Sequence, residues 1–235
     1  MLIAGLQKTT LIDYPGKIAC VVFLAGCNFR CPFCYSAEIV LPEKILRQPT
    51  ISEEKFFAFL KDKVGMLDGV VVCGGEPTLN EDLPNFIRKI KNLGFLVKLD
   101  TNGSNPAMLK KLFKGNFLDY VAMDIKAKPE NYKKVGCGAA DFQKIEESVK
   151  ELKKNNIAFE FRTTMVPGLV SASDMPQIAK WIGGLDVSYY LQNFRPDKTL
   201  DPSLMSLSPY TDQEIKEAEQ AAQPYFKSVK VRNYI

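Results

Sequence analysis

The sequence contains no histidine at any of its 235 positions. This absence excludes His-based catalytic triads, removes the commonest general base and takes away a frequent zinc ligand. Long apolar runs are also missing: none reaches the roughly 18 residues of a membrane-spanning helix, and the Met1–Gly5 start is too short for a signal peptide. No block of Lys and Arg stands out, and the formal net charge is only +4. We therefore expect a cytoplasmic protein with no membrane and no nucleic-acid partner.

Cysteine is scarce, with six residues in the chain, but Cys27, Cys31 and Cys34 fall close together in one short loop. Cytoplasmic cysteines stay reduced, so a tight cluster indicates metal binding or catalysis before disulfides. Three thiolates without a fourth local ligand leave a coordination position open, as reactive sites do. The loop therefore predicts an open iron–sulfur site. A zinc site that recruits Cys73 or Cys137 is the alternative, and otherwise Cys73 is expected to be a core residue and Cys137 a loop thiol.

Apolar runs alternate with amphipathic segments along the chain, whose length suits one α/β core. Predicted strands cover residues 18–24, 69–73, 95–99, 118–123, 157–163 and 187–191, with a short edge strand at 229–231. Predicted helices cover residues 52–64, 81–93, 106–113, 141–154, 173–182 and 211–222. Parallel neighbours need crossover helices, so this alternation predicts a parallel α/β sheet.

The first long helix shows how local signals define an element. Ser52 is its expected N-cap, and Phe56, Phe57, Leu60 and Val64 form its expected apolar stripe. A serine ahead of helical spacing of apolar residues is typical of a helix packed by one face on a sheet.

A polar or glycine-rich segment directly follows each predicted strand. In chain order these segments are the cysteine loop, Gly74-Gly75-Glu76-Pro77, Asp100-Thr101-Asn102-Gly103, Asp124-Ile125-Lys126, Arg162-Thr163-Thr164 and residues 192–196. The carboxyl ends of parallel strands lie on one face of the sheet, where active sites are built. Residues far apart in the sequence are therefore expected to meet in one cleft.

Two of these segments resemble a known family. Cys27-x-x-x-Cys31-x-Phe33-Cys34 resembles the cluster motif of the radical S-adenosylmethionine (SAM) superfamily, and Gly74-Gly75-Glu76-Pro77 resembles its methionine-binding signature. The resemblance implies a partial (β/α)6 TIM-like barrel of parallel strands, with the active site at their C-terminal ends. It implies a radical SAM core over residues 18–194, an N-terminal extension over 1–17 and a C-terminal extension over 195–235 that packs on the core.

A narrower resemblance concerns the glycyl-radical-enzyme activases. Asp13-Tyr14-Pro15-Gly16-Lys17 and the segments that begin at Asp100 and Asp124 resemble this branch. Residues 5–16 are most similar to proteins that activate anaerobic ribonucleoside-triphosphate reductase. Tyr35-Ser36 departs from the His-Asn that many activases carry at this place.

The resemblance implies a mechanism and its cofactors. Three cysteines would hold a [4Fe–4S] cluster whose free iron chelates the amino and carboxylate groups of SAM. Reduction would cleave SAM to methionine and a 5′-deoxyadenosyl radical, which takes hydrogen from a glycine Cα of a partner enzyme. The implied partners are a glycyl radical enzyme, first of all anaerobic ribonucleotide reductase, and a flavodoxin or ferredoxin electron donor. The cofactors carry the bond-breaking, while the protein binds, orients and excludes water.

The resemblance also implies roles for individual residues. Gly74 and Gly75 lack a Cβ and would let backbone groups approach the methionine ammonium, while Glu76 would tie down the strand end and meet the amino group. The remaining implied cofactor-binding residues are Phe33 and Tyr35 (packing beside the cluster), Thr101 and Asn102 (ribose or carboxylate oxygens), Asp100 and Asp124 (the same site, with a candidate cation), and Lys126 and Arg162 (the SAM carboxylate).

Other interpretations remain open from the sequence. Gly-Gly-Glu-Pro alone is a common turn, Asp124 and Lys126 could form a surface ion pair, and Arg162 could be a solvated strand end. Within enzymes, the alternative function is a radical SAM catalyst that acts on a small molecule or RNA. From a different class, the alternative is a metal-stabilised binding module without turnover.

Overall fold

The structure is a computed structural model that describes residues 1–136 and 140–232. Its strands are β1 Ile3–Thr10, β2 Ala19–Leu24, β3 Gly69–Gly74, β4 Leu96–Thr101, β5 Tyr120–Asp124, β6 Ala158–Met165, β7 Gly184–Asn193 and β8 Phe226–Arg232. Its α-helices are α1 Ala37–Val40, α2 Pro42–Ile45, α3 Glu53–Asp62, α4 Leu83–Asn92, α5 Pro106–Lys114, α6 Tyr132–Val135, α7 Phe142–Lys154, α8 Met175–Ile182 and α9 Asp212–Ala222. The prediction of a loop thiol at Cys137 lies outside the described residues.

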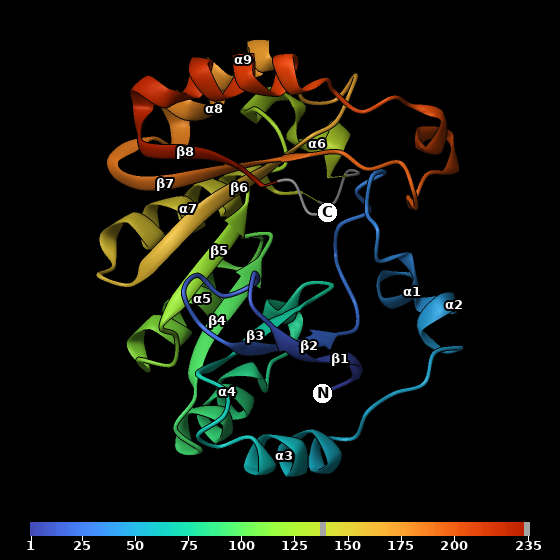
Figure 1. Cartoon of the computed structure of the whole chain (residues 1–235), viewed down its shortest axis with the longest axis vertical. Helices are drawn as coiled ribbons and strands as arrows, with labels where there is room; N and C mark the ends of the chain where they lie inside the picture. The colour runs from blue at the N-terminus through green and yellow to red at the C-terminus, as the bar shows by residue number, and fades with distance from the viewer. Residues whose placement is uncertain (137–139, 233–235) are drawn as a thin grey trace.

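The eight strands form one curved sheet in the order β1 to β8 (Figure 1). All neighbours from β2 to β8 pair in parallel, whereas β1 pairs antiparallel with β2. Among the described residues β1 and β8 do not pair with each other, so the sheet is an open barrel. The predicted parallel α/β fold and partial TIM-like barrel are confirmed, with two strands more than the six of the predicted barrel.

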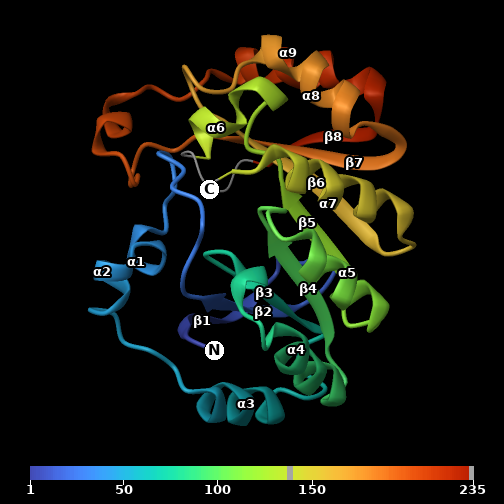
Figure 2. The same cartoon turned by 180° about the vertical axis from the view of Figure 1, so that it is seen from behind.

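The predicted helices are present in the structure. Ser52 Oγ accepts a hydrogen bond from Lys55 N at 3.3 Å and caps α3, and Phe56 and Leu60 are buried. The predicted stripe is wrong at Val64, which is 54% exposed because α3 ends two residues earlier. Figure 2 shows α4, α5 and α7 along the outer side of the sheet, while α8 and α9 cover the end formed by β7 and β8.

The inner face of the sheet carries its own small core near the amino ends of the strands. Tyr14, in the turn between β1 and β2, is 4% exposed and packs with Val21 and Val71. A Cβ at Gly69 would lie 2.8 Å from Leu96 O and 3.0 Å from the Tyr14 ring, so glycine is required for this close approach. The Asp13-Tyr14-Pro15-Gly16-Lys17 segment therefore closes one end of the barrel and leaves the other end open.

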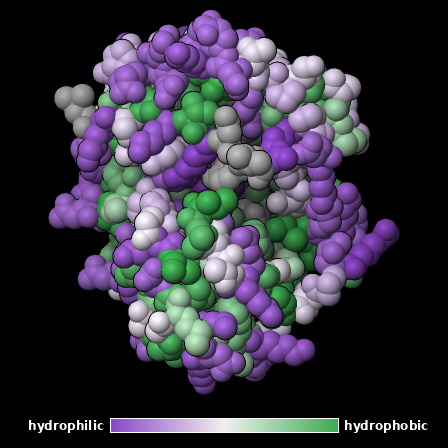
Figure 3. All heavy atoms as spheres, in the orientation of Figure 1, coloured by the Kyte–Doolittle hydropathy of each residue, from purple (hydrophilic) through white to green (hydrophobic). Residues whose placement is uncertain are grey.

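The surface leaves some apolar side chains exposed. On the face shown in Figure 3, apolar residues gather across the middle and hydrophilic residues surround them. Within the described residues, no helix combines the length and the apolar character that crossing a membrane requires.

Candidate functional site

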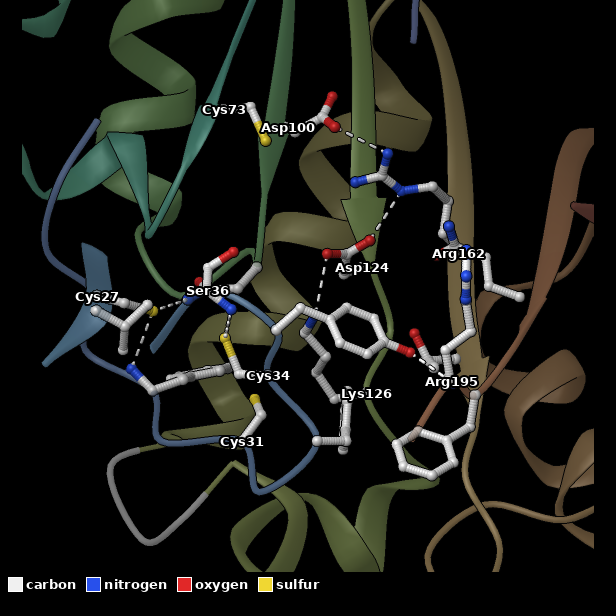
Figure 4. Close-up of a pocket in the computed structure, with 18 of the residues that line it drawn as sticks. Cys27, Cys31, Cys34, Ser36, Cys73, Asp100, Asp124, Lys126, Arg162 and Arg195 are labelled. Carbon is white, nitrogen blue, oxygen red and sulfur yellow. Dashed lines mark hydrogen bonds and ion pairs between the residues drawn. The ribbon is translucent and has the colours of Figure 1, made fainter. Parts of the chain in front are cut away.

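A cavity of about 660 Å³ opens at the carboxyl ends of the parallel strands. All of the site residues predicted from the sequence line this cavity except Glu76. They are Cys27, Cys31, Phe33, Cys34, Tyr35, Gly74, Gly75, Asp100, Thr101, Asn102, Asp124, Lys126 and Arg162. Figure 4 shows the three cysteines on one loop at one side of the pocket and Asp100, Asp124 and Arg162 at another. The sheet topology thus brings together segments separated by more than a hundred residues, as predicted.

The cysteine loop directs backbone donors at its own sulfur atoms. Phe29 N donates to Cys27 Sγ at 3.3 Å, and Ser36 N donates to Cys34 Sγ at 3.4 Å (Figure 4). Burial raises the pKa of Cys27 to about 11, although the Phe29 N–H group lowers it. A positive centre at this place would therefore convert buried thiols into ligands, because it supplies the charge that stabilises the thiolate.

The spacing of the three thiols bears on the kind of metal group that they could hold. Within the described parts of the chain, no three Cys, Asp or Glu side chains converge closely enough to hold a single metal ion. A cluster differs from a single ion because each thiolate bonds to a different iron, so the sulfur atoms need not meet at one point.

The end of β3 is tied directly to the start of the cysteine loop. Gly75 N donates to Leu24 O at 2.8 Å, and Glu76 N donates to Gly26 O at 2.8 Å. A Cβ at Gly74 would overlap the backbone of Leu24, and one at Gly75 would overlap the Gly26 carbonyl. The glycines were predicted from close approach to a ligand, and the structure adds a second cause, the close approach of two backbones.

Glu76 points away from the cavity. Its carboxylate is 1% exposed and accepts hydrogen bonds from Thr101 Oγ1 at 2.8 Å, Asn102 N at 2.6 Å and Thr78 N at 3.1 Å. Burial raises the pKa of Glu76, while these donors lower it. The side chain ties the ends of β3 and β4 together, as predicted, but it does not line the cavity where an amino group of SAM would contact it.

A charged network crosses the inner face of β4, β5 and β6. Arg162 donates to Asp100 Oδ2 from Nη1 and to Asp124 Oδ1 from Nε, both at 2.8 Å. Lys126 Nζ pairs with Asp124 at 2.9 Å, and the buried Lys98 pairs with Asp100. Although burial raises the pKa of both carboxyl groups, Arg162 and the lysines hold it below the usual value. Arg162 is only 11% exposed, so it is no solvated strand end.

Several residues line the cavity without having been predicted individually from the sequence. Cys73 was predicted to be a core residue, but it lies on the inner face beside Asp100 and lines the cavity (Figure 4). The alternation of side chains along a strand could have predicted this position, because Val71 and Cys73 lie on the same face of β3. Phe29, Thr164, Gln192, Asn193, Phe194 and Arg195 also line the cavity and belong to segments that were expected there, although they were given no individual roles. The cavity-lining residues outside those segments are Ser36, Val40, Pro209 and Asp212.

Residues 195–210, between β7 and α9, pass over the cysteine loop. Arg195 N donates to the Tyr35 hydroxyl at 2.7 Å, and Asp201 N donates to Pro32 O at 2.9 Å. The hydroxyl of Tyr35 therefore has a structural partner beside the cavity. These contacts connect the two sides of the open barrel above the site.

An open α/β barrel with a three-cysteine loop over its carboxyl end defines a class of enzymes. Residues 21–182 match the Radical SAM superfamily, so the chain belongs to this superfamily and is a radical SAM enzyme. A protein of Methanocaldococcus jannaschii with the provisional name glycyl-radical enzyme activating enzyme is 34% identical over 98% of this chain and 95% of its own length.

More distant similarities extend across the superfamily. A protein of Thermococcus kodakarensis with the provisional name GTP 3′,8-cyclase is 24% identical over 77% of this chain and 63% of its own length. A solved structure of a spore photoproduct lyase mutant superposes with a TM-score of 0.65 at 13% identity, covering 96% of this chain and 80% of that one. This structural likeness concerns the fold alone.

The cofactors of the superfamily are a [4Fe–4S] cluster and SAM, and the residues present fit both. Cys27, Cys31 and Cys34 line the cavity together, where they would supply three sulfur ligands and would leave one iron without a protein ligand. The charged groups beyond them offer partners for the ammonium and carboxylate of an amino acid, and the cavity is large enough for a ligand of this size.

Proposed function

We propose that this radical SAM enzyme generates a glycyl radical on a partner enzyme. The observation that carries the proposal is the similarity, over nearly the whole of both chains, to a protein provisionally named as an activating enzyme. The proposed partner is anaerobic ribonucleoside-triphosphate reductase, which the resemblance of residues 5–16 favours. The proposed electron donor is a flavodoxin or ferredoxin.

The residues of the cavity suit the work that this function leaves to the protein. When bound, the reduced cluster supplies the electron that cleaves SAM to methionine and a 5′-deoxyadenosyl radical. Cys27, Cys31 and Cys34 hold the cluster, while Lys126, beside the cysteine loop, and Arg162, across the cavity, orient the SAM carboxylate. Phe33, 4% exposed, limits the access of water to the sulfur atoms.

The remaining proposed contacts come from the strand ends. Thr101 binds oxygens of SAM, and the backbone of Gly74 and Gly75 binds its amino group. Asn102 lines the same cavity, but both N–H bonds of its amide already have acceptors in Asn28 and Cys27. Asp100 and Asp124 pair with Arg162 and hold its guanidinium in the cavity. We propose residues 18–194 as the catalytic core, with 1–17 and 195–235 as its extensions.

The test is radical transfer to the proposed partner. Anaerobically reconstituted protein, SAM, dithionite and the reductase should give a glycyl radical doublet in electron paramagnetic resonance spectra, together with 5′-deoxyadenosine. Cys27→Ala should abolish both products and reduce bound iron, whereas Cys20→Ala, in the buried core, should retain iron and activity. Cleavage of SAM without any protein radical would reject the activase and leave the radical SAM enzyme in place.

A second candidate function is catalysis on a small molecule. The similarity to a protein named GTP 3′,8-cyclase favours it, but the alignment covers a smaller share of both chains. A nucleotide-dependent product that forms without any partner protein would support this alternative.

A further inference from the structure

We propose that Asn102 is a positioning residue that sets the reduction potential of the cluster through a hydrogen bond to the Cys27 thiolate. Asn102 Nδ2 lies 3.9 Å from Cys27 Sγ, and the residue is 6% exposed. The inference rests on a cluster bound at the three cysteines, but not on the identity of the partner enzyme.

The orientation of the Asn102 amide is fixed by its neighbours. Its Oδ1 accepts a hydrogen bond from Ser104 N at 2.9 Å, so the nitrogen must occupy the opposite side of the amide plane. There Nδ2 lies 3.1 Å from Asn28 Oδ1 and faces Cys27 Sγ. The two N–H bonds of Asn102 thus face two acceptors, Asn28 Oδ1 and Cys27 Sγ. A flipped amide would instead place the Asn102 oxygen against these two acceptors, with no hydrogen between them.

The backbone of Asn102 is held just as firmly. Asn102 N donates to Glu76 Oε2 at 2.6 Å, and Thr101 Oγ1 donates to Glu76 Oε1 at 2.8 Å. Asn28 Nδ2 donates to Ser104 Oγ at 2.9 Å and closes the ring of contacts around the amide. Glu76, which does not line the cavity, therefore contributes to the site by holding Asn102 in place.

The electrostatic consequence has a definite sign. Reduction adds negative charge to the cluster and its thiolates, so a donor aimed at sulfur stabilises the reduced state and raises the reduction potential. Phe29 N also donates to Cys27, but a backbone group is not removed by substitution. Asn102 is a side-chain donor to the same sulfur, so its contribution can be deleted.

The experiment compares Asn102→Leu, Asn102→Asp and the control Asn105→Asp. Leucine removes the donor at similar size, and aspartate retains the acceptor for Ser104 but replaces the donor with an oxygen. Asn105 lies in the same loop, caps α5 and bonds Met108 N, so aspartate there adds the same charge without altering a contact to sulfur. Midpoint potentials of anaerobically reconstituted proteins are measured without SAM by redox titration monitored by electron paramagnetic resonance.

We expect both Asn102 variants to bind as much iron as the unmodified protein and to have a more negative midpoint. The expected ratio of reduced to oxidised cluster at a fixed potential falls about tenfold, which is ~59 mV for a one-electron couple. Asn105→Asp should shift the midpoint much less.

Equal midpoints in the Asn102 variants and the unmodified protein would overturn the proposal, as would an equal shift in Asn105→Asp. Loss of iron from both Asn102 variants would also overturn it, because the residue would then be needed for assembly. All of these outcomes are separate from glycyl radical formation, which is measured only with the partner present.

Discussion

Gly75 is held to its residue type by the backbone of another segment. A Cβ at this position would overlap the Gly26 carbonyl and would also lie 3.2 Å from Cys27 N. Neither neighbour can move alone, because Glu76 N donates to the same carbonyl and Gly75 N bonds Leu24 O. Any side chain here therefore pushes the end of β3 away from the cysteine loop.

We predict that Gly75→Ala lowers the free energy of unfolding of the apoprotein by about 1–3 kcal/mol, as overpacking usually does. Because the displaced backbone carries Cys27, the variant should also bind less iron after reconstitution. Urea unfolding and iron analysis measure the two effects. The control is Gly94→Ala, where an added Cβ would meet no other atom but the backbone has a φ of 90°. This variant should lower the free energy of unfolding by about 1 kcal/mol and should bind as much iron as the unmodified protein. Full iron binding by Gly75→Ala would contradict this argument.

At the scale of residues, the sequence predicted which residues lie at the site better than it predicted where their side chains point. Strand ends were recognisable from residue types, so residues such as Asp124 and Arg162 were placed correctly around the cavity. The direction of Glu76 was not predictable, because it depends on donors from β4 that lie 25 and 26 residues away. Cys73 packs against the inner core, in line with its prediction as a core residue, but its place in the cavity wall was not predicted, because an apolar strand residue can face either side of a sheet.

The strand β8 is joined to the sheet by a buried ion pair. Glu160, on the inner face of β6, is 0% exposed and accepts hydrogen bonds from Arg232 Nη1 at 2.6 Å and Nη2 at 2.8 Å. Tyr120 Oη donates to the same carboxylate at 2.7 Å, and the Arg232 guanidinium lies 3.6 Å from the centre of the Tyr190 ring. Three strands, β5, β6 and β8, thus meet at one carboxylate, and β7 contacts the Arg232 guanidinium through Tyr190.

We predict that Arg232→Met lowers the free energy of unfolding by about 3–5 kcal/mol, because it leaves a buried carboxylate without its charged partner. Adding Glu160→Gln should recover part of this loss, since the amide carries no charge to bury. The control Lys150→Met breaks an exposed pair with Glu146 and should change stability by less than about 0.5 kcal/mol. Urea unfolding of the apoproteins measures all three, and equal effects for Arg232→Met and Lys150→Met would refute the prediction.

At the scale of elements, periodicity identified the buried strands and missed an exposed one. β2 and β3 are apolar runs whose residues are mostly buried, and both were predicted. β1 was not predicted, because most of its residues are exposed or only partly buried and its sequence shows no alternation. Its pairing with β2 supplies the structure that its own sequence does not specify. β8 was predicted at 229–231 and extends over Phe226–Arg232.

The whole molecule is organised so that charge accumulates at the open end of the barrel. The closed end carries Tyr14 with apolar neighbours, whereas the inner face above it carries Lys98, Asp100, Asp124 and Arg162. The opposite charges lie on three neighbouring strands and neutralise one another across them. No single stretch of sequence shows this balance, since it exists only after the strands have paired.

This arrangement makes the free energy of unfolding of the apoprotein depend on pH. Arg162 and Lys126 hold the pKa of Asp124 well below its usual value of 3.8, and Arg162 and Lys98 lower that of Asp100 despite burial. A carboxyl group with a lowered pKa stabilises the folded state above its unfolded pKa, and this contribution is lost as the pH falls toward the folded pKa. Glu76, whose pKa burial raises, contributes with the opposite sign.

We therefore predict that Asp124→Asn is less stable than the unmodified apoprotein at neutral pH and that the difference shrinks in acid. As the pH falls through 3.8, the Asp124 carboxyl takes up a proton in the unfolded chain while it stays ionised in the folded protein, so its contribution to stability shrinks. The variant has no such group to titrate. Glu76 is present in both proteins, so its opposite effect cancels in the comparison. Urea unfolding from about pH 7 to about pH 3 measures the two curves. Curves that stay parallel over this range would show that the charged network does not couple Asp124 to folding.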